Sequence, residues 1–232
     1  LNYSYLDDLA TAVGTDTADR SPLIQAIKNS AVRTYLENLG YQIIIHDSGL
    51  PDMDINSAKL EATTRLDMLQ SLQNKLGKHS YFENLLLSST LFGPFLLPAD
   101  NAFDQHRQLI LFNLEQTSAS TALPGPKLVI THVLAPHPPF VFAADGTPLT
   151  PDYEYEVFDG NHYHGPDAQY VSGYRDQLTY LNTRLEKTIE EIVSNSVNDP
   201  IIIIQGDHGP GSQLDWESVD HSCIQERMAI LN

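Results

Sequence analysis

The chain has 232 residues, of which 41% are hydrophobic and 19% are charged, as in globular proteins with a proper core and unlike disordered ones. Its 30 acidic and 13 basic residues give a formal net charge of −17, and the absence of any run of Lys or Arg argues against a nucleic-acid partner. The single cysteine, Cys223, excludes an internal disulfide and a cysteine-based zinc cluster. An anionic substrate would be repelled by this charge unless a bound cation offset it locally.

The first half of the chain alternates helical and extended patterns. Ser21 followed by Pro22 is a typical helix start, and apolar residues at helical spacing continue to Gly40, a typical helix end. The apolar run at 85–97 is interrupted by a glycine and a proline and is too short to cross a bilayer, which takes roughly 20 residues. The other elements predicted in this half are a strand at 41–46, a loop at 50–56, and helices at 59–76, 84–97 and 105–115.

The second half is patterned as strand, long loop, helix and strand. A Pro-Gly-Pro break precedes a predicted buried strand at 127–134, and residues 135–166 are rich in Pro, Gly, Asp and Tyr, which predicts a long and functional loop. Apolar residues then keep a 3.6-residue period over 168–194, which predicts a long helix. Because this helix joins two strands, we expect a right-handed crossover and parallel pairing within a single α/β domain spanning residues 1–232.

Four isoleucines at 201–204 lead directly into Asp207, His208 and Gly209. An unbroken run of β-branched residues predicts a strand buried on both faces, in the middle of a parallel sheet. The acid and the histidine would then lie at the carboxyl end of a central strand, where open α/β sheets build their ligand sites. A carboxylate beside a neutral imidazole suits a divalent metal such as Zn²⁺ or Mn²⁺. The alternative is a strand followed by a Gly-Pro turn with two incidental polar residues.

Two further histidines are candidates for the same site. His137 follows the strand at 127–134 and stands between prolines, which restrict its backbone. A stiffened imidazole at a strand end suits contact with an anion or a leaving group, and an exposed histidine in a proline-rich turn is the alternative. His221 lies beyond a Gly-Pro-Gly turn and is within reach of the same site. His162 and His164 have the pattern of an exposed loop.

One series of features, taken in chain order, carries a resemblance to a known family. The series contains the strand at 127–134, Pro136-His137-Pro138-Pro139-Phe140, Tyr170, Tyr174 and Gln177 on a long helix, the isoleucine run, and Asp207-His208-Gly209. This order resembles the alkaline phosphatase superfamily. Within it, the chain is most similar to membrane-anchored sulfatase-like proteins, the branch that includes lipoteichoic acid synthases and phosphoethanolamine transferases. The resemblance covers roughly residues 125–232.

The resemblance implies a three-layer α/β/α sandwich with a mostly parallel central sheet, present here in part. It implies that Asp207 and His208 bind a divalent metal, which would be Mn²⁺, Zn²⁺, Mg²⁺ or Ca²⁺. His137 would contact the transferred phosphate or sulfate group, and His221 would assist. The substrate would be a phosphate or sulfate ester of a lipid or a cell-envelope glycan. The parent protein would be anchored in a membrane, with this domain outside the cytoplasm and no membrane segment in this chain.

The chain departs from the family near its start. Family members carry an early strand ending in an acidic metal ligand, followed by a Thr or Ser nucleophile, or by formylglycine in true sulfatases. Neither motif is visible, and Cys-x-Pro-x-Arg is absent. We therefore expect a fragment that binds metal weakly by itself and turns over little or no ester. Open sheet edges would favour self-association. The alternative is a non-catalytic α/β binding or assembly domain, with the tyrosines between 153 and 180 lining a sugar or partner surface.

Overall fold

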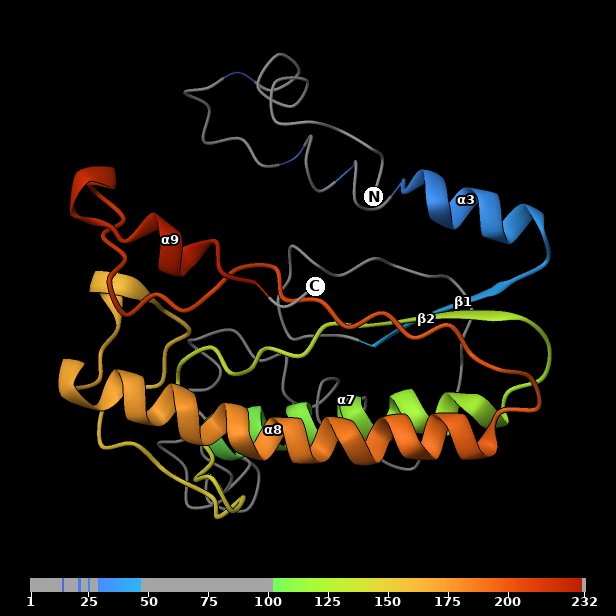
Figure 1. Ribbon diagram of the computed structural model, residues 1–232, viewed down its shortest axis with the longest axis horizontal. Coiled ribbons are helices and arrows are strands. Elements are labelled where there is room, and N and C mark those ends of the chain that lie inside the picture. Colours follow the sequence, from blue (N-terminus) through green and yellow to red (C-terminus); the bar gives the residue numbers. More distant parts are fainter. Residues whose placement is uncertain (1–13, 15–20, 22–24, 26–28, 47–101, 231–232) are drawn as a thin grey trace, which may run out of the picture.

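The computed structural model describes residues 14, 21, 25, 29–46 and 102–230, which form a mixed, broadly α/β arrangement (Figure 1). The predictions at 50–56, 59–76, 84–97 and for the early part of the first helix lie outside these residues. The described elements are the helices α3 (Ala31–Asn38), α7 (Ala102–Ala119), α8 (Asp167–Asn195) and α9 (Ile224–Arg227), the strands β1 (Gln42–His46) and β2 (Lys127–Thr131), and the 3₁₀ turns η2 (Ser120–Ala122), η3 (Gly160–His162) and η4 (Val219–His221).

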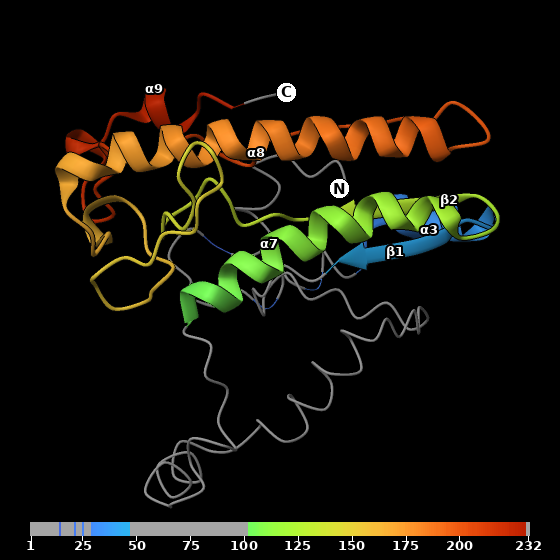
Figure 2. The same cartoon turned by 90° about the horizontal axis from the view of Figure 1, so that it is seen from below.

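The two described strands, β1 and β2, pair in parallel, whereas the parallel pairing predicted from the sequence was between the strand at 127–134 and the isoleucine run. Ile44 lies opposite Val129 in this register, and Ile43 and Ile44 are both buried. Helix α3 contacts β1 on one side of the strand pair, and α7 contacts both strands from the other side (Figures 1 and 2). The predicted strands at 41–46 and 127–134 are therefore confirmed, although the second ends at Thr131.

The first predicted helix, from Ser21 to Gly40, is interrupted before α3. Ser30 has a ψ of 127°, which lies outside helical geometry, and its hydroxyl accepts a hydrogen bond from the N–H of Arg33 at 3.5 Å. Serine favours this capping position because its oxygen satisfies an N–H that has no helical partner. The predicted end is confirmed, since Gly40 takes a φ of +83°, which glycine adopts without a steric penalty.

The core lies between α7 and α8, which pack along each other (Figure 2). It is formed by Phe103, Ile110, Leu114, Val141, Phe142 and Leu181. Two of these residues, Val141 and Phe142, come from the long loop after β2, so part of that loop is interior structure. The predicted helices at 105–115 and 168–194 are confirmed. Within the described segments, every helix is too short or too polar to cross a bilayer.

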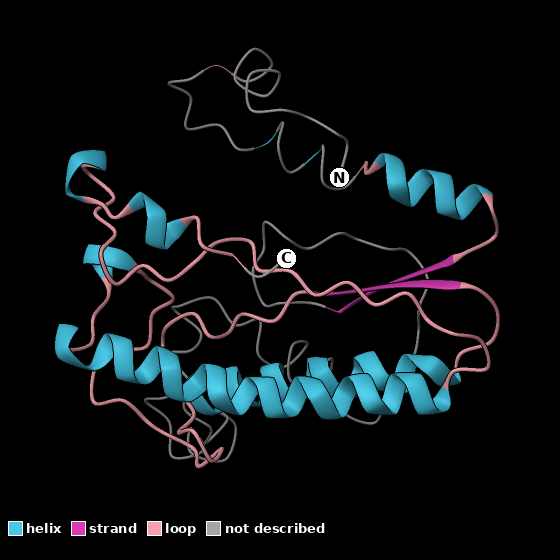
Figure 3. Ribbon diagram, viewed as in Figure 1, coloured by secondary structure: helices cyan, strands magenta, loops and turns pink. Residues whose placement is uncertain are grey.

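The isoleucine run at 201–204 does not form the predicted buried strand. Figure 3 draws this segment as a loop, although it runs in the same direction as β1 and β2. Ile201 and Ile203 are 93% and 80% exposed. β-branched residues favour an extended backbone, but a strand also needs a neighbour that exchanges ladder hydrogen bonds with it. No backbone hydrogen bond to another described residue reaches this run, so the predicted central strand and its pairing with β2 are wrong here.

Gly173 on α8 provides a test of how this helix packs against the loop after β2. A β-carbon at this position would overlap the ring of Phe140, which is held between the rings of Tyr163 and Tyr170. Replacing glycine by alanine inside a helix normally stabilises by about 1 kcal/mol, whereas overpacking costs about 1–3 kcal/mol. We predict that Gly173→Ala lowers the free energy of unfolding by up to about 2 kcal/mol in urea denaturation, because the overlap outweighs the helix preference.

The matched control is Ser172→Ala, at the neighbouring exposed position of the same helix. It should change the free energy of unfolding by less than about 0.5 kcal/mol. A Gly173→Ala variant as stable as the wild type, or more stable, would contradict the described contact between α8 and Phe140.

Candidate functional site

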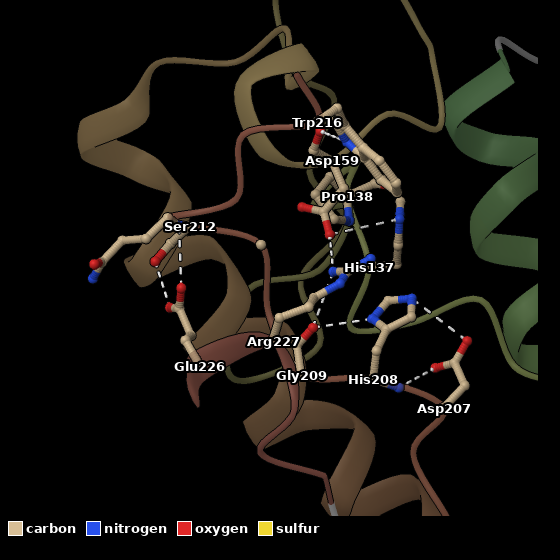
Figure 4. Close-up of polar contacts among 12 residues, drawn as sticks. His137, Pro138, Asp159, Asp207, His208, Gly209, Ser212, Trp216, Glu226 and Arg227 are labelled. Atoms are coloured by element: carbon tan, nitrogen blue, oxygen red, sulfur yellow. Dashed lines mark hydrogen bonds and ion pairs between the residues drawn. The ribbon is translucent and has the colours of Figure 1, made fainter. Parts of the chain in front are cut away.

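Three of the four predicted site residues lie together (Figure 4). The imidazole rings of His137 and His208 are 6.3 Å apart between centroids, at an interplanar angle of 65°. The Oδ2 atom of Asp207 lies 3.5 Å from Nε2 of His208. His137 comes from the loop after β2 and the other two residues from the segment after the isoleucine run, so two distant parts of the sequence meet at this place.

The fourth predicted residue, His221, is placed elsewhere. Its Nδ1 atom lies 3.3 Å from Oδ2 of Asp215, and its side chain is 76% exposed. Nearby on the surface, Nε2 of His162 lies 2.8 Å from Oε1 of Glu217. The described structure therefore places His221 in an exposed ion pair and does not bring it to the two paired rings.

A buried glutamine on α8 sets the position of His137. Gln177 is 0% exposed, and its Nε2 donates to the carbonyl oxygen of His137 at 3.2 Å. Its Oε1 accepts from the N–H of Val141 at 2.7 Å. The same side chain therefore satisfies backbone groups on both sides of the proline pair, where the peptide bonds preceding Pro136 and Pro139 are cis. Because the Gln177 side chain is buried and both of its polar atoms are bonded to this loop, the loop is attached to the helix at a fixed place.

The carbonyl of the next residue orients each ring of the pair. Nδ1 of His137 lies 2.7 Å from the oxygen of Pro138, and Nδ1 of His208 lies 3.0 Å from the oxygen of Gly209. A carbonyl oxygen only accepts, so Nδ1 carries the hydrogen in each ring. In the neutral ring, the lone pair then lies on Nε2. This is the atom that binds a metal or takes up a proton.

The Asp207–His208 turn packs against the segment that contains α9. The N–H of Gly209 donates to the carbonyl oxygen of Arg227 at 2.7 Å, and Nη1 of Arg227 donates to the carbonyl oxygen of Gly209 at 3.1 Å. A β-carbon at position 209 would overlap the carbonyl oxygen of Glu226. Glycine is therefore required after His208 because two backbone segments approach closely there.

A buried carboxylate that sequence reasoning missed, Asp159, lies beside the ring pair (Figure 4). Its side chain is 3% exposed and accepts hydrogen bonds from the hydroxyl of Tyr170 at 2.5 Å and from Nη1 of Arg227 at 2.6 Å. Nε2 of His137 lies 4.0 Å from its Oδ2 atom. The backbone oxygen of Asp159 accepts from Nε1 of Trp216 at 3.0 Å. No pattern marks this residue in the sequence, because it stands in an irregular loop without periodicity.

Burial and the neighbouring groups have opposite effects on the pKa values of Asp159 and His137. Burial by itself would raise the pKa of Asp159, but hydrogen bonds from Tyr170 and other donors hold that pKa below its ordinary value. Burial lowers the pKa of His137, and this effect outweighs the raising effect of the nearby carboxylate. At neutral pH the structure therefore holds an ionised carboxylate beside a neutral imidazole.

The tyrosines of the 153–180 region pack mainly inward. The rings of Tyr153, Tyr163, Tyr170 and Phe140 contact one another in sequence, with centroid separations between 5.3 and 5.7 Å. Burial raises the pKa of Tyr163 and of Tyr170. These rings therefore support the site from the interior and do not form an open aromatic surface.

Within the described residues, the metal-binding capacity of the site rests on Asp207 and His208. The carboxylate and Nε2 of the ring converge, and their side chains are 71% and 34% exposed, so both are open to solvent. No group of three or more His, Cys, Asp or Glu side chains is arranged for a metal in the described part of the chain. Since zinc normally takes three or four protein ligands, two donors form half of a metal site.

Comparisons with known proteins identify no relative of this chain. No family model, no curated protein and no solved structure matches it. Its function is therefore inferred from the geometry of its own residues and from the resemblance in its motifs.

His106 on α7 is a further buried histidine near this site. It is 5% exposed, its ring centroid lies 5.9 Å from that of Tyr155, and its Nε2 atom has no hydrogen-bond partner in the described structure. Burial, with a smaller contribution from His137, lowers the pKa of His106 from 6.5 to about 4. The folded protein therefore keeps this ring neutral over a pH range in which the unfolded chain protonates it.

This lowered pKa predicts a loss of stability in weak acid. As the pH falls below 6.5, the unfolded chain takes up a proton at His106 before the folded chain does, so the contribution to stability is lost progressively down to about pH 4. The full shift corresponds to ~3 kcal/mol. We predict that urea denaturation will show a free energy of unfolding lower at pH 4.5 than at pH 7, and that His106→Leu will remove much of this difference. His221→Asn, at an exposed position, should retain it. An unchanged pH dependence in His106→Leu would contradict the prediction.

Proposed function

We propose that this chain forms part of the site of a metal-dependent hydrolase or transferase acting on phosphate or sulfate esters. The observation that supports this most is the convergence of His137, Asp207 and His208 from distant parts of the sequence. The sequence resemblance assigns these same three positions to the chemistry of the family. In both rings Nδ1 lies against the carbonyl oxygen of the following residue, which leaves Nε2 to present its lone pair.

In this proposal, Asp207 and His208 are ligands of the divalent metal. The carbonyl of Gly209 accepts from Nδ1 of His208 and so orients Nε2 toward the side of the carboxylate, as a hydrogen-bond acceptor behind a metal-bound histidine does. A divalent cation bound there would offset the negative charge of the protein and of the ester, and would lower the pKa of an attacking hydroxyl. Mn²⁺, Zn²⁺, Mg²⁺ and Ca²⁺ all accept a carboxylate ligand, and the imidazole favours the first two.

His137 is the proposed contact of the transferred group. Burial keeps its ring neutral, so Nε2 is available to take up a proton during the reaction. The carboxylate of Asp159, 4.0 Å away, would stabilise the ring once it is protonated. His221 is left out of this proposal because its described partner is Asp215 at the surface.

The proposal also extends to residues outside the described part of the chain. Two metal donors need further ligands, and the described residues near the ring pair supply no nucleophile in an assigned role. We propose that these groups belong to a longer parent protein with a fuller three-layer α/β/α sandwich. The resemblance further supports a membrane-anchored parent that presents this domain outside the cytoplasm to an ester of a lipid or a cell-envelope glycan.

The alternative function is a non-catalytic binding or assembly domain with the same α/β fold. This alternative requires the tyrosines between 153 and 180 to line a sugar or partner surface. The inward packing of Tyr163 and Tyr170 does not favour an open aromatic surface there. The two functions differ in one measurable property, because only the enzyme-type site needs a cation at Asp207 and His208.

Paramagnetic broadening directly tests the metal half-site, which is the pair of donors Asp207 and His208. We predict that Mn²⁺ added to the protein with isotope-labelled histidines will broaden the imidazole resonances of His208 before those of the exposed His164 and His221. Asp207→Asn should weaken this effect at least about tenfold in Mn²⁺ concentration, because one of the two donors loses its charge. The measurement suits weak binding, which is what two donors provide.

The matched control is Asp199→Asn, an exposed acid in the segment preceding the isoleucine run. It should leave the broadening of His208 unchanged, since it removes the same charge from the protein without touching the half-site. Equal broadening of all exposed histidines, or an effect on His208 that Asp207→Asn does not reduce, would count against the proposed function.

A further inference from the structure

Asp159 joins separate segments of the chain, and each of its oxygen atoms is engaged. Its carboxylate bonds to Tyr170 on α8 and Arg227 on α9, and its backbone oxygen bonds to the indole of Trp216. His137, from the loop after β2, lies against the same carboxylate. A charged group that is buried and hydrogen-bonded in this way acts as a fixed anchor, since any displacement would leave it unpaired in the interior.

Arg227 carries the link from this anchor to the Asp207–His208 turn. One nitrogen, Nη1, donates both to Oδ2 of Asp159 and to the carbonyl oxygen of Gly209. The backbone oxygen of Arg227 accepts the N–H of the same glycine, and that glycine's oxygen is the partner of Nδ1 of His208. An unbroken series of contacts therefore runs from the buried carboxylate to the imidazole. The guanidinium is further confined by the Trp216 ring, at 5.9 Å from its centroid.

The backbone beyond the turn also passes close over the carboxylate. A β-carbon at Gly211 would lie 2.5 Å from both side-chain oxygens of Asp159. The N–H of Gly211 donates to the hydroxyl of Tyr170 at 2.8 Å, and that hydroxyl donates to Asp159. The segment 209–211 is thus attached twice to the same anchor, once through Arg227 and once through Tyr170.

We propose that Asp159 and Arg227 are a positioning pair that holds the Asp207–His208 turn against His137. The pair does not bind the substrate in this proposal; it sets the distance between the two imidazole rings. Its importance for ester chemistry rests on the proposed function, whereas the positioning itself is a property of the fold and is measurable without any metal or substrate.

Amide hydrogen exchange followed by NMR on the whole chain tests this inference. In Asp159→Asn the charge that holds Arg227 is lost, so the amides of Gly209 and Gly211 should exchange at least about tenfold faster. The amides of Val141, bonded to Gln177, and Leu149, bonded to the carbonyl of Val141, should stay within about twofold of the wild type. The nuclear Overhauser effects between the rings of His137 and His208 should weaken in parallel.

Several outcomes would overturn the inference. Unchanged exchange at Gly209 and Gly211 would show that the pair does not hold this segment. Equal acceleration at Val141 and Leu149 would show a general loss of stability in place of positioning. Asp145→Asn is the matched control, since this exposed carboxylate bonds only within its own turn among the described residues, and it should leave the exchange of both glycines unchanged.

Two more variants distinguish coupling between Asp159 and Arg227 from a general loss of stability. Arg227→Lys keeps a cation for Asp159 but loses the nitrogen shared with Gly209, so it should accelerate Gly209 and spare Gly211 even if Asp159→Asn fails to fold. In Asp159→Asn/Arg227→Lys, exchange at Gly209 should be no faster than in the faster-exchanging of the two single variants, because the two residues act as one unit. Additive acceleration in the double variant, or no effect of Arg227→Lys on Gly209, would contradict a positioning pair.

The same samples distinguish this inference from the proposed function. If exchange responds as expected but Mn²⁺ never broadens His208 selectively in the wild-type protein, the pair positions the turn and the metal chemistry is wrong. If Mn²⁺ broadens His208 selectively and Asp159→Asn leaves the exchange rates of the Gly209 and Gly211 amides unchanged, the metal half-site is supported and the positioning role is wrong.

Discussion

The buried ion pair between Asp159 and Arg227 is the constraint on which the rest of the site depends. The carboxylate of Asp159 is buried and the side chain of Arg227 is largely shielded from water, and such a pair is tolerable only when further hydrogen bonds satisfy its remaining atoms. The hydroxyl of Tyr170 donates to the carboxylate and the carbonyl oxygen of Gly209 accepts from the guanidinium, which also lies over the Trp216 ring. Breaking a buried pair from one side costs about 3–5 kcal/mol, because the other charge is left without a partner. The segments that carry His137 and His208 are therefore joined around this ion pair, with Tyr170 providing a second attachment through Gly211.

The site combines a closed side with an open side. Asp159 and Gln177 are buried and hold the backbone and ring of His137 in one orientation, with burial keeping that imidazole neutral. Asp207 and His208 are open to solvent on the other side, where a cation has direct access. This separation would suit the proposed ester chemistry, because proton transfer needs a group held in place, and metal binding needs exposed donors with a path for entry.

The fold contributes to this arrangement chiefly through the loop after β2, part of which is buried in the core. Residues 140–142 after β2 are fully buried and pack against α7 and α8, and Gln177 bonds to the backbone of this loop. The irregular stretch predicted from its composition is thus ordered by the helices on which it lies.

The amino-acid sequence by itself determined the local elements, namely the helix at 168–194, the strands near Ile44 and Val129, the irregular loop at 135–166, and the helix end at Gly40. Their signals are short-range, because periodicity, capping and left-handed backbone preferences act between neighbouring residues. Only the tertiary structure decided that the isoleucine run is exposed, that His221 pairs with Asp215, and that Asp159 is the anchor of the site. Burial and charge pairing depend on which distant segment arrives beside a residue, and the partner of Asp159 is 68 positions away along the chain.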